Sequence, residues 1–482
     1  MEKFKLSALN SIDSISGDIC ALSDAIWEVP ETAFRETEST RLQCEALEKL
    51  GFEVEKDLAG IPTAFSGRWG SGKPVIGVLG EFDALSGLSQ QANIAVKDPI
   101  AAGGNGHGCG HNLLGAGSVA AAYAIKEYLK ETGKSGTVIY YGCPGEEGGS
   151  GKAFMARDGI FDELDAALSW HPQDFNGAWY ESTLANYQVN YKFSGVSSHA
   201  AAAPHKGRSA LDAVELMNVG VQFLREHVTP DVRMHYAITN SGGFSPNVVQ
   251  SKAEVLYLLR ANETPAVQEI YERVNDIARG AALMTGTNVE IEFIKACSNI
   301  IVNNVVADVI HNNMVEIGCP KFTDEELKYA AEIRETLDKK TNPMEKIIPK
   351  LRPDKAEWVS AQSVEPIPEF IIPRVYTDSV MSGSSDVGDV SWVCPTGQVL
   401  AATWPTGVPA HSWQATAVGK SGFAKKAMLF AGKAMAGAAI DMIENPEIIE
   451  KAKAEQVKRI GDGPFVSPIP KDVKPAAIGM KN

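Results

Sequence analysis

The sequence predicts an α/β fold in which a mostly parallel sheet carries an inserted α+β domain of the ferredoxin-like type. Short apolar runs at 74–80, 137–141, 166–170 and 399–404 read as strands covered on both faces. The first two are separated by a helical pattern, as in βα units that build parallel sheets. Between about 184 and 298 the predicted order changes to β-α-β-β-α-β, which is the order of the ferredoxin-like unit.

The length and charge of the chain limit its architecture and its partners. At 482 residues it exceeds what one hydrophobic core usually supports. We therefore expect a discontinuous domain at 1–183 and 299–482, with an inserted domain at 184–298. The formal net charge of -15 argues against nucleic acid or an anionic membrane as a partner, because a negative surface repels phosphates. A small-molecule or peptide substrate is expected instead.

The elements of the larger domain place polar residues where its strands end. The chain opens with a helical pattern at about 12–50, and a turn at 51–54 leads into a strand. A helix at about 113–131 connects the first two apolar strands. The polar residues that follow the four strands in turn are Glu81 and Asp83, Glu146 and Glu147, His171, and His411. Sites in parallel sheets collect beyond the carboxyl ends of the strands, so we expect these side chains to lie together.

The inserted region and the C-terminal part follow different patterns. The insertion is predicted to contain strands at 187–193, 233–239, 254–260 and 288–295 and helices at 209–227 and 265–284. The stretch at 341–373 is rich in proline and charge and is predicted to be a long irregular excursion, at the surface or at the active site. The tail after Gly461 is expected to be loosely held.

The cysteines and the apolar segments indicate the compartment. Seven cysteines, an odd number scattered along so long a chain, do not resemble a disulfide framework and are expected to be reduced. The N-terminus has no apolar stretch typical of a signal peptide, and no later segment offers eighteen uninterrupted apolar residues. We expect a cytoplasmic protein.

Metal-binding side chains are concentrated just before the N-terminal end of a predicted helix, in the run Gly106-His107-Gly108-Cys109-Gly110-His111. A mixture of cysteine, histidine and glutamate suits a borderline divalent ion such as zinc, with manganese or cobalt as alternatives. Downstream, Glu146 and Glu147 lie on a glycine-flanked turn. Two adjacent glutamates can divide the work, one binding the metal and the other acting as a base toward the activated water. The sequence therefore predicts a metal-dependent reaction.

Four segments together resemble the M20 metallopeptidase/amidohydrolase family, and the resemblance covers nearly the whole chain. They are 107–112 (HGCGHN), 145–149 (GEEGG), 195–201 (GVSSHAA) and 410–412 (AHS). Within the family the chain resembles the branch that contains aminobenzoyl-glutamate hydrolases, acyl-amino-acid amidohydrolases and related dipeptidases. This resemblance implies a metal-bearing α/β catalytic domain and an inserted domain that dimerises and acts as a lid.

The resemblance also implies roles for individual residues. The ligands of two divalent ions, zinc or manganese, would be Cys109, His111, Glu147, His171 and His411, and Glu146 would be the base. Many family members place a histidine at the end of the first strand, where this chain reads GEFDAL at 80–85, so that histidine is missing here. Asp83 resembles an acidic residue that supports the metal ligands without binding the ions itself. Such a residue is expected because ligating histidines need a carboxylate partner.

The inserted domain carries a second set of candidate residues. His199 resembles a family histidine that reaches the site of a neighbouring subunit and polarises the scissile carbonyl, which implies a homodimer. Asn247 and Arg260 resemble residues that hold the substrate. Because an arginine fork matches a carboxylate, a substrate with a free carboxylate such as glutamate is implied.

The expected function is metal-dependent hydrolysis of an amide bond between an acyl or aminoacyl group and an amino acid, with aminobenzoyl-glutamate as the candidate substrate. A dipeptidase or an N-acyl-amino-acid amidohydrolase would use the same site. A third alternative is a non-catalytic accessory subunit with a structural metal, working with a second kind of subunit. Structural metal sites are closed by four protein ligands, whereas the spare Glu146 favours an open, catalytic one.

Overall fold

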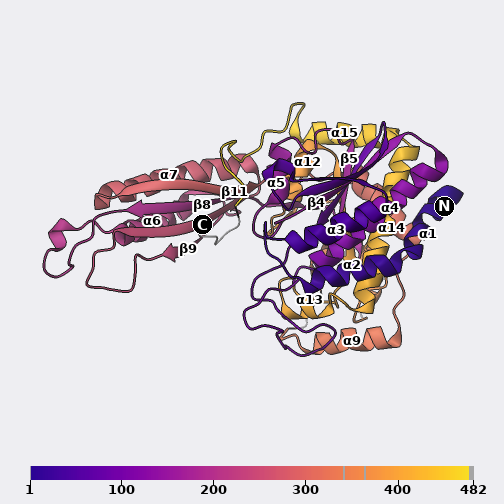
Figure 1. Ribbon diagram of the computed structural model, residues 1–482, viewed down its shortest axis with the longest axis horizontal. Helices are drawn as coiled ribbons and strands as arrows, with labels where there is room; N and C mark the ends of the chain where they lie inside the picture. Colours follow the sequence, from indigo (N-terminus) through magenta and orange to yellow (C-terminus); the bar gives the residue numbers. More distant parts are fainter. Residues whose placement is uncertain (1, 340–341, 343, 363–364, 477–482) are drawn as a thin grey trace.

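The computed structural model describes residues 2–339, 342, 344–362 and 365–476, and it has two parts. A larger part contains a seven-stranded sheet between layers of helices, and a narrow four-stranded part extends from one side of it (Figure 1). The α/β fold class predicted from the sequence is confirmed. Positions 341, 343, 363 and 364 of the predicted excursion, and positions 477–482 of the tail, lie outside the described residues.

The seven-stranded sheet has a parallel centre and antiparallel edges. The strands, in spatial order, are β1 (Glu53–Lys56), β2 (Phe65–Ser71), β4 (Gly136–Cys143), β3 (Val75–Glu81), β5 (Ala166–Gln173), β13 (Thr396–Ala402) and β6 (Gly177–Ala178). The four strands from β4 to β13 are parallel, as the apolar runs predicted. β1, which agrees with the strand expected after the turn at 51–54, and the unpredicted strands β2 and β6 add antiparallel edges, so the sheet is mixed.

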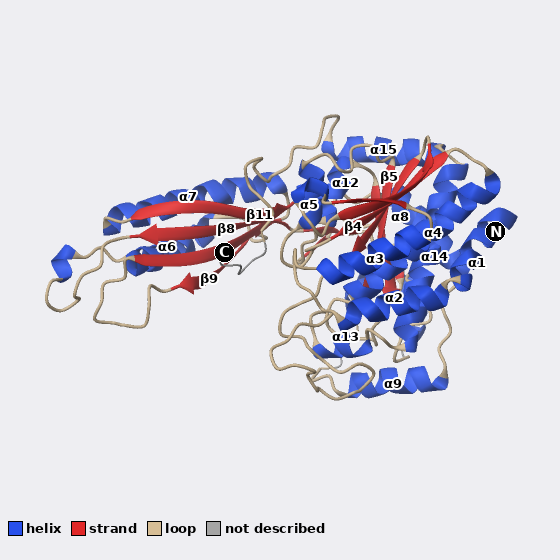
Figure 2. Ribbon diagram, in the orientation of Figure 1, coloured by secondary structure: helices blue, strands red, loops and turns tan. Residues whose placement is uncertain are grey.

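The central strands are buried on both faces because their alternate side chains enter two different cores. Ile76 and Val78 of β3 pack into one hydrophobic cluster, whereas Val75 and Leu79 pack into another. The first cluster is formed with α4 (His111–Thr132), α8 (Asn304–Ile317) and α14 (Gly422–Glu444). The second is formed with α5 (Gly151–Arg157) and α12 (Val387–Val393). Figure 2 shows these helices around the central strands.

The helical pattern predicted at 12–50 is three helices rather than one continuous stretch. They are α1 (Lys3–Ser14), α2 (Ser16–Glu28) and α3 (Thr37–Lys49). The break after α2 has a local cause, because the residue before Pro30 is pushed away from helical geometry. Phe34, in the same connection, has a φ of 61°, which also excludes a continuous helix.

The inserted part has the predicted order, β8-α6-β9-β10-α7-β11. Its elements are β8 (Ala185–Ser194), α6 (Ala210–Leu224), β9 (Arg233–Asn240), β10 (Lys252–Ala261), α7 (Thr264–Thr285) and β11 (Asn288–Cys297). The strands pair antiparallel in the spatial order β11-β8-β10-β9, and both helices pack on the sheet (Figure 1). This arrangement is the ferredoxin-like unit. We keep 184 and 298 as proposed boundaries of the insertion.

The excursion predicted as irregular contains short helices and a small core of its own. It includes α10 (Met344–Ile347) and α11 (Pro353–Gln362), and Met344, Val359 and Phe370 are buried together. The remaining elements are α9 (Asp324–Glu335), α13 (Trp413–Val418), α15 (Glu447–Ile460), the paired short strands β7 (Ser182–Thr183) and β12 (Val380–Met381), and the 3₁₀ turns η1 (Leu58–Gly60), η2 (Pro204–Lys206), η3 (Arg225–His227) and η4 (Ile348–Lys350). Within the described part of the chain, no helix combines the length and the apolar character that a membrane crossing requires.

A buried carboxyl group fixes the point where the chain returns from the inserted part. The backbone N–H and the hydroxyl of Ser298 donate to Asp389 in α12, at 3.0 and 2.9 Å. Burial raises the pKa of Asp389 to about 7, although these two hydrogen bonds oppose the rise. The folded protein therefore keeps a proton that the unfolded chain releases, and stability is lost as the pH rises from about 4 to about 7.

Asp389→Asn is expected to remove this pH dependence, because the amide can still hydrogen-bond Ser298 but carries no charge. Relative to the unsubstituted protein, the variant should gain up to about 4 kcal/mol in free energy of unfolding between pH 4 and pH 8. Urea denaturation of both proteins, freed of metal by a chelator, at several pH values measures this difference. A difference that stays constant with pH would contradict the prediction.

Candidate metal centre

Three glycine-containing turns bring the candidate side chains to the carboxyl ends of the parallel strands. The first turn ends the long connection from β3 to α4 and carries Cys109, and His111 is the first residue of the helix. Its glycines are needed because a Cβ at Gly106 would lie 2.0 Å from the carbonyl oxygen of Leu88. The second turn follows β4 and carries Glu146 and Glu147. A Cβ at Gly149 there would lie 2.4 Å from the ring of Phe34.

The third segment carries His411 and is tied to the first. The backbone N–H of His411 donates to the carbonyl oxygen of Gly108, at 2.9 Å. His411 has a φ of 59°, a conformation that non-glycine residues adopt rarely and that clusters at functional sites. Two segments far apart in the sequence are thus held against each other by the backbone as well as by their side chains.

Cys109 is common to two groups of possible ligands. The thiol is grouped with His111 and His171 on one side and with Glu147 and His411 on the other, and within each group the ligand atoms lie within 4.8 Å of one another. Cys109 Sγ is 3.5 Å from His171 Nε2, and Glu147 Oε1 is 3.1 Å from His411 Nε2. The structure therefore brings all five predicted ligands together.

His111, which is buried, and His171, which is partly buried, each have one ring nitrogen bound and the other directed to the centre. His111 Nδ1 is 2.9 Å from Asp83 Oδ1, and His171 Nδ1 is 2.7 Å from the carbonyl oxygen of Pro172. Asp83 also accepts from the backbone N–H of Glu147, at 3.0 Å. Asp83 thus orients one candidate ligand by its side chain and another by its backbone, as expected of a residue that steadies a metal site.

The donor set and its unsatisfied atoms fit a divalent cation. His111 Nε2 is fully buried and has no hydrogen-bond partner in the described part of the chain. Buried polar atoms are normally paired, and an ion between these donors would supply the missing partner. The centre is open on one side, because the side chain of His411 is 52% exposed. An open side is typical of a catalytic rather than a structural metal site.

The two adjacent glutamates have opposite electrostatic surroundings. Burial opposes ionisation of Glu147, but the hydrogen bond to His411 and the charge of His111 outweigh it and lower its pKa to about 2. Burial raises the pKa of Glu146 well above its usual range, and the negative charges of Glu81 and Glu147 add to the effect. Glu147 is therefore suited to bind a cation, and Glu146 to hold a proton.

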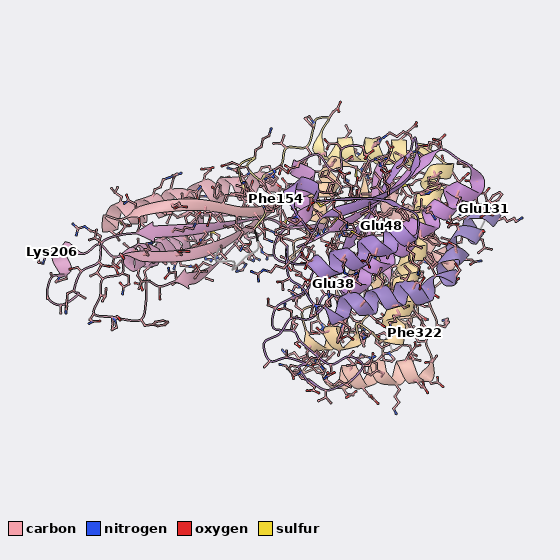
Figure 3. All side chains as sticks on the ribbon, viewed as in Figure 1. Glu38, Glu48, Glu131, Phe154, Lys206 and Phe322 are labelled. Carbon is pink, nitrogen blue, oxygen red and sulfur yellow. The ribbon has the colours of Figure 1, made fainter. Side chains whose placement is uncertain are left out.

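The predicted residues of the inserted part lie in two different places. His199 and Asn247 are exposed neighbours, since the backbone N–H of Ala200 donates to the carbonyl oxygen of Asn247 at 2.9 Å. They belong to the loops at the outer end, where Figure 3 labels Lys206, so one chain does not bring them to Cys109. Arg260 is half-buried at the opposite end of β10, and its Nη1 lies 3.5 Å from Ser384 Oγ.

Three charged residues behind the centre had been given no role in the site from the sequence, although Glu81 was expected near it as a strand-end residue. They are Glu81, Lys152 and Asp386, and all three are buried. The sequence offered only weak signals for them: a carboxylate at a strand end, a single lysine in a short apolar helix, and an acidic Gly/Ser-rich loop whose role could not be assigned.

Comparison with known proteins identifies similar sequences and folds. A model of the family described as Peptidase family M20/M25/M40 matches residues 78–345. The chain is 46% identical over 459 residues to one of the subunits of p-aminobenzoyl-glutamate hydrolase from Escherichia coli (strain K12), covering 95% of each chain. It is 30% identical over 472 residues to the Xaa-Arg dipeptidase of Mus musculus, covering 94% of this chain and 92% of the relative. A dinuclear metal-binding peptidase of the M20 family from Bacillus subtilis has the same fold, with a TM-score of 0.54 at 16% identity, covering 90% of this chain and 99% of that one.

Proposed function

Because this chain belongs to peptidase family M20/M25/M40 and is a metal-dependent amidohydrolase, we propose that it cleaves the amide bond between a p-aminobenzoyl group and glutamate. The observation that carries the proposal is the position of Cys109 between two ligand groups, with the carboxyl group of Glu146 beside them. The relative that is 46% identical supports the choice of substrate through its name.

We propose that two ions, zinc or manganese, are held by these groups. Cys109, His111 and His171 would hold one ion, and Cys109, Glu147 and His411 the other. Such ions lower the pKa of water from about 15.7 toward about 7, so that hydroxide is available near neutral pH. The thiol of Cys109 must be ionised to serve both sites, and burial raises its pKa in the absence of a neighbouring cation.

Glu146 would move the proton in both halves of the reaction. Its carboxylate takes the proton from the attacking water and then gives it to the leaving nitrogen of glutamate. The raised pKa of Glu146 suits this exchange, because a general base works best when its pKa approaches the working pH. No covalent intermediate on the protein is needed.

A cavity of about 470 Å³ beside the centre is proposed to hold the aryl part of the substrate. Gln173 and Pro409, each two residues from a proposed histidine ligand, line its inner end. The cavity is also lined by apolar and aromatic side chains, including Phe175, Trp179, Ile372, Val375 and Leu400. Part of this wall belongs to the 341–373 excursion, for which we therefore propose a role in substrate selection. Its volume is within the range of small-ligand pockets.

The inserted part is proposed to form a homodimer that completes the site. Apolar side chains are exposed along its helices, with Phe223 72% and Leu283 84% exposed, and β9 is an edge strand of its sheet. Such surfaces typically mark protein contacts. His199 of one subunit would then polarise the carbonyl in the other, while Asn247 and Arg260 hold the glutamate carboxylates. A second kind of subunit is a further possible partner, since the Escherichia coli relative is named as a subunit.

A dipeptidase activity is the second candidate, favoured by the similarity to the mouse Xaa-Arg dipeptidase over 94% of this chain. The purified chain, tested alone with zinc or manganese, should hydrolyse p-aminobenzoyl-glutamate and should lose this activity to a chelator. We expect its kcat/KM to exceed those for an N-acyl amino acid and an Xaa-Arg dipeptide by at least about tenfold. A higher value for the dipeptide would favour the second candidate, and no activity with any substrate would favour an accessory role.

A substitution in the cavity tests where the aryl group binds. Val375→Trp should raise the KM for p-aminobenzoyl-glutamate by about tenfold, because the larger side chain fills the cavity, while metal content stays unchanged. Val457→Trp, on the exposed surface of α15, is the matched control and should leave KM unchanged. An unchanged KM in both variants would place the aryl group elsewhere.

A further inference from the structure

Behind the metal centre, a completely buried ammonium group is held by two carboxylates. Lys152 is the second residue of α5, the helix that follows the Glu146–Glu147 turn. Its Nζ lies 2.8 Å from Glu81 Oε1 and 2.6 Å from Asp386 Oδ1. The backbone N–H of Lys152 also donates to Asp386 Oδ2, at 2.8 Å. Asp386 therefore fixes both the backbone and the charged end of this lysine.

Glu81 connects this ammonium group to the metal centre. One carboxylate oxygen faces Lys152, and the other, Oε2, lies 3.3 Å from His111 Nε2. Neither Glu81 Oε2 nor His111 Nε2 has a hydrogen-bond partner in the described part of the chain, although both are buried. Glu81, His111 and Glu146 each offer a ligand atom within 4.8 Å of the other two. Unsatisfied donor atoms gathered at one point are what a cation there would need.

We propose that Lys152 is a positioning residue of the metal centre, and that it acts by holding Glu81 with one oxygen free for the ion bound by His111. The inference rests on the proposed dinuclear centre and adds Glu81 to its donors. Glu81 is the last residue of β3, so its backbone is fixed by the central sheet. The remaining freedom is that of its side-chain torsions, which the contact with the ammonium group of Lys152 restricts.

The charge of Lys152 is essential to this arrangement. Burial disfavours the charged form, but Asp386 and Glu81 outweigh it and hold the pKa of Lys152 well above its usual range. Without the ammonium group, two buried carboxylates would face each other unpaired, which is strongly unfavourable. Glu81 would then turn away from Asp386 or take up a proton, and in either state it would be a poorer donor to a cation.

The chain offers a matched control for this lysine. Lys5 in α1 is also buried between two carboxylates, with its Nζ 2.6 Å from Asp441 and 3.3 Å from Glu316. These partners lie on α14 and α8, away from the candidate ligands. Lys5→Met and Lys152→Met therefore each remove a buried ammonium group from between two carboxylates, which are partly exposed around Lys5 and buried around Lys152. Only Lys152 lies against the metal centre. Both substitutions should lower the thermal stability of the protein.

The test measures manganese affinity by chelator competition and the visible spectrum of the cobalt-substituted protein. We expect Lys152→Met to weaken the binding of one of the two ions by about 10- to 100-fold and to change the cobalt spectrum. Lys5→Met should leave both measurements unchanged. Unchanged affinity and spectrum in a folded Lys152→Met protein would overturn the proposal.

Glu81→Gln decides the question if Lys152→Met does not fold. This variant keeps the Lys152–Asp386 pair neutral and leaves no buried charge unpaired. We expect the same loss of affinity for one ion, of at least about tenfold, and wild-type behaviour would again overturn the proposal. Failure of the wild-type chain to bind two ions would refute the proposed function, whereas two ions in the wild type with an unchanged Glu81→Gln variant would refute only this inference.

Discussion

Replacement of Cys109 by alanine is expected to remove both metal ions and with them the hydrolytic activity. The thiol is the one donor shared by the two ligand groups, so its loss leaves each group with only two of its three side chains. Loss of a residue that merely supports a ligand typically costs 10- to 100-fold in metal affinity, and loss of a shared ligand should cost more than about 100-fold. Elemental analysis of the dialysed protein measures the metal, and an amide hydrolysis assay measures the activity.

Cys44→Ala is the matched control for this prediction. Cys44 is also a free, buried cysteine, but it lies in α3 and contributes to the hydrophobic core. This variant is expected to lose some stability and to retain both ions. If Cys109→Ala kept two ions per chain, Cys109 would not be a ligand and the two ligand groups would have to be redefined.

Glu146→Gln is expected to abolish turnover while leaving both ions bound. Glu146 is the proposed carrier of the proton, and loss of a general acid–base residue lowers kcat by about 10²- to 10⁴-fold. Glutamine is similar in size, so KM should change little. Glu147→Gln, at the adjacent position, should instead lose metal, because Glu147 belongs to a ligand group with Cys109 and His411.

Glu146→Gln and Glu147→Gln together separate the roles of the two glutamates. Equal loss of metal in both variants would contradict the assignment of Glu146 as the base.

A mixture of subunits tests the role of His199. If His199 acts on the neighbouring subunit, co-expression of Glu146→Gln and His199→Ala chains should restore about a quarter of the wild-type activity, since half of the dimers then contain one intact site. No restoration would place His199 outside the reaction.

The fold could be predicted where the pattern of apolar residues is unambiguous. The central strands are buried on both faces, so their apolar runs stand out, and the inserted part alternates clearly between strand and helix. A strand was expected where β1 lies, but β2 and β6 were not predicted, because a strand that is partly exposed or only two residues long carries little apolar signal. The helical stretch expected at 12–50 is interrupted, because the break at Pro30 is a local backbone effect within a continuous apolar pattern.

The residues of the candidate site could likewise be predicted only where the sequence carries a local signal. Cys109, His111 and the two glutamates lie on glycine-rich turns that are visible in the sequence. His171 and His411 could be placed near them because each follows an apolar strand, and the resemblance to a family supplied their roles as ligands. Lys152 could not be predicted, because its position between Glu81 and Asp386 depends on contacts across 234 residues of sequence. No local pattern distinguishes a lysine that is buried in this way from one on a solvated helix face.

The order of strands also determines when the metal centre can form during synthesis. β13 lies between β5 and β6, and it follows the inserted part in the chain, as do His411 and Asp386. Until β13 and the segment after it have left the ribosome, β5 keeps an unpaired edge, and each nascent chain has only four of its five proposed ligands. We therefore expect metal loading to be a late step of maturation, and a chain that stops early to expose the edge of β5 beside an incomplete site.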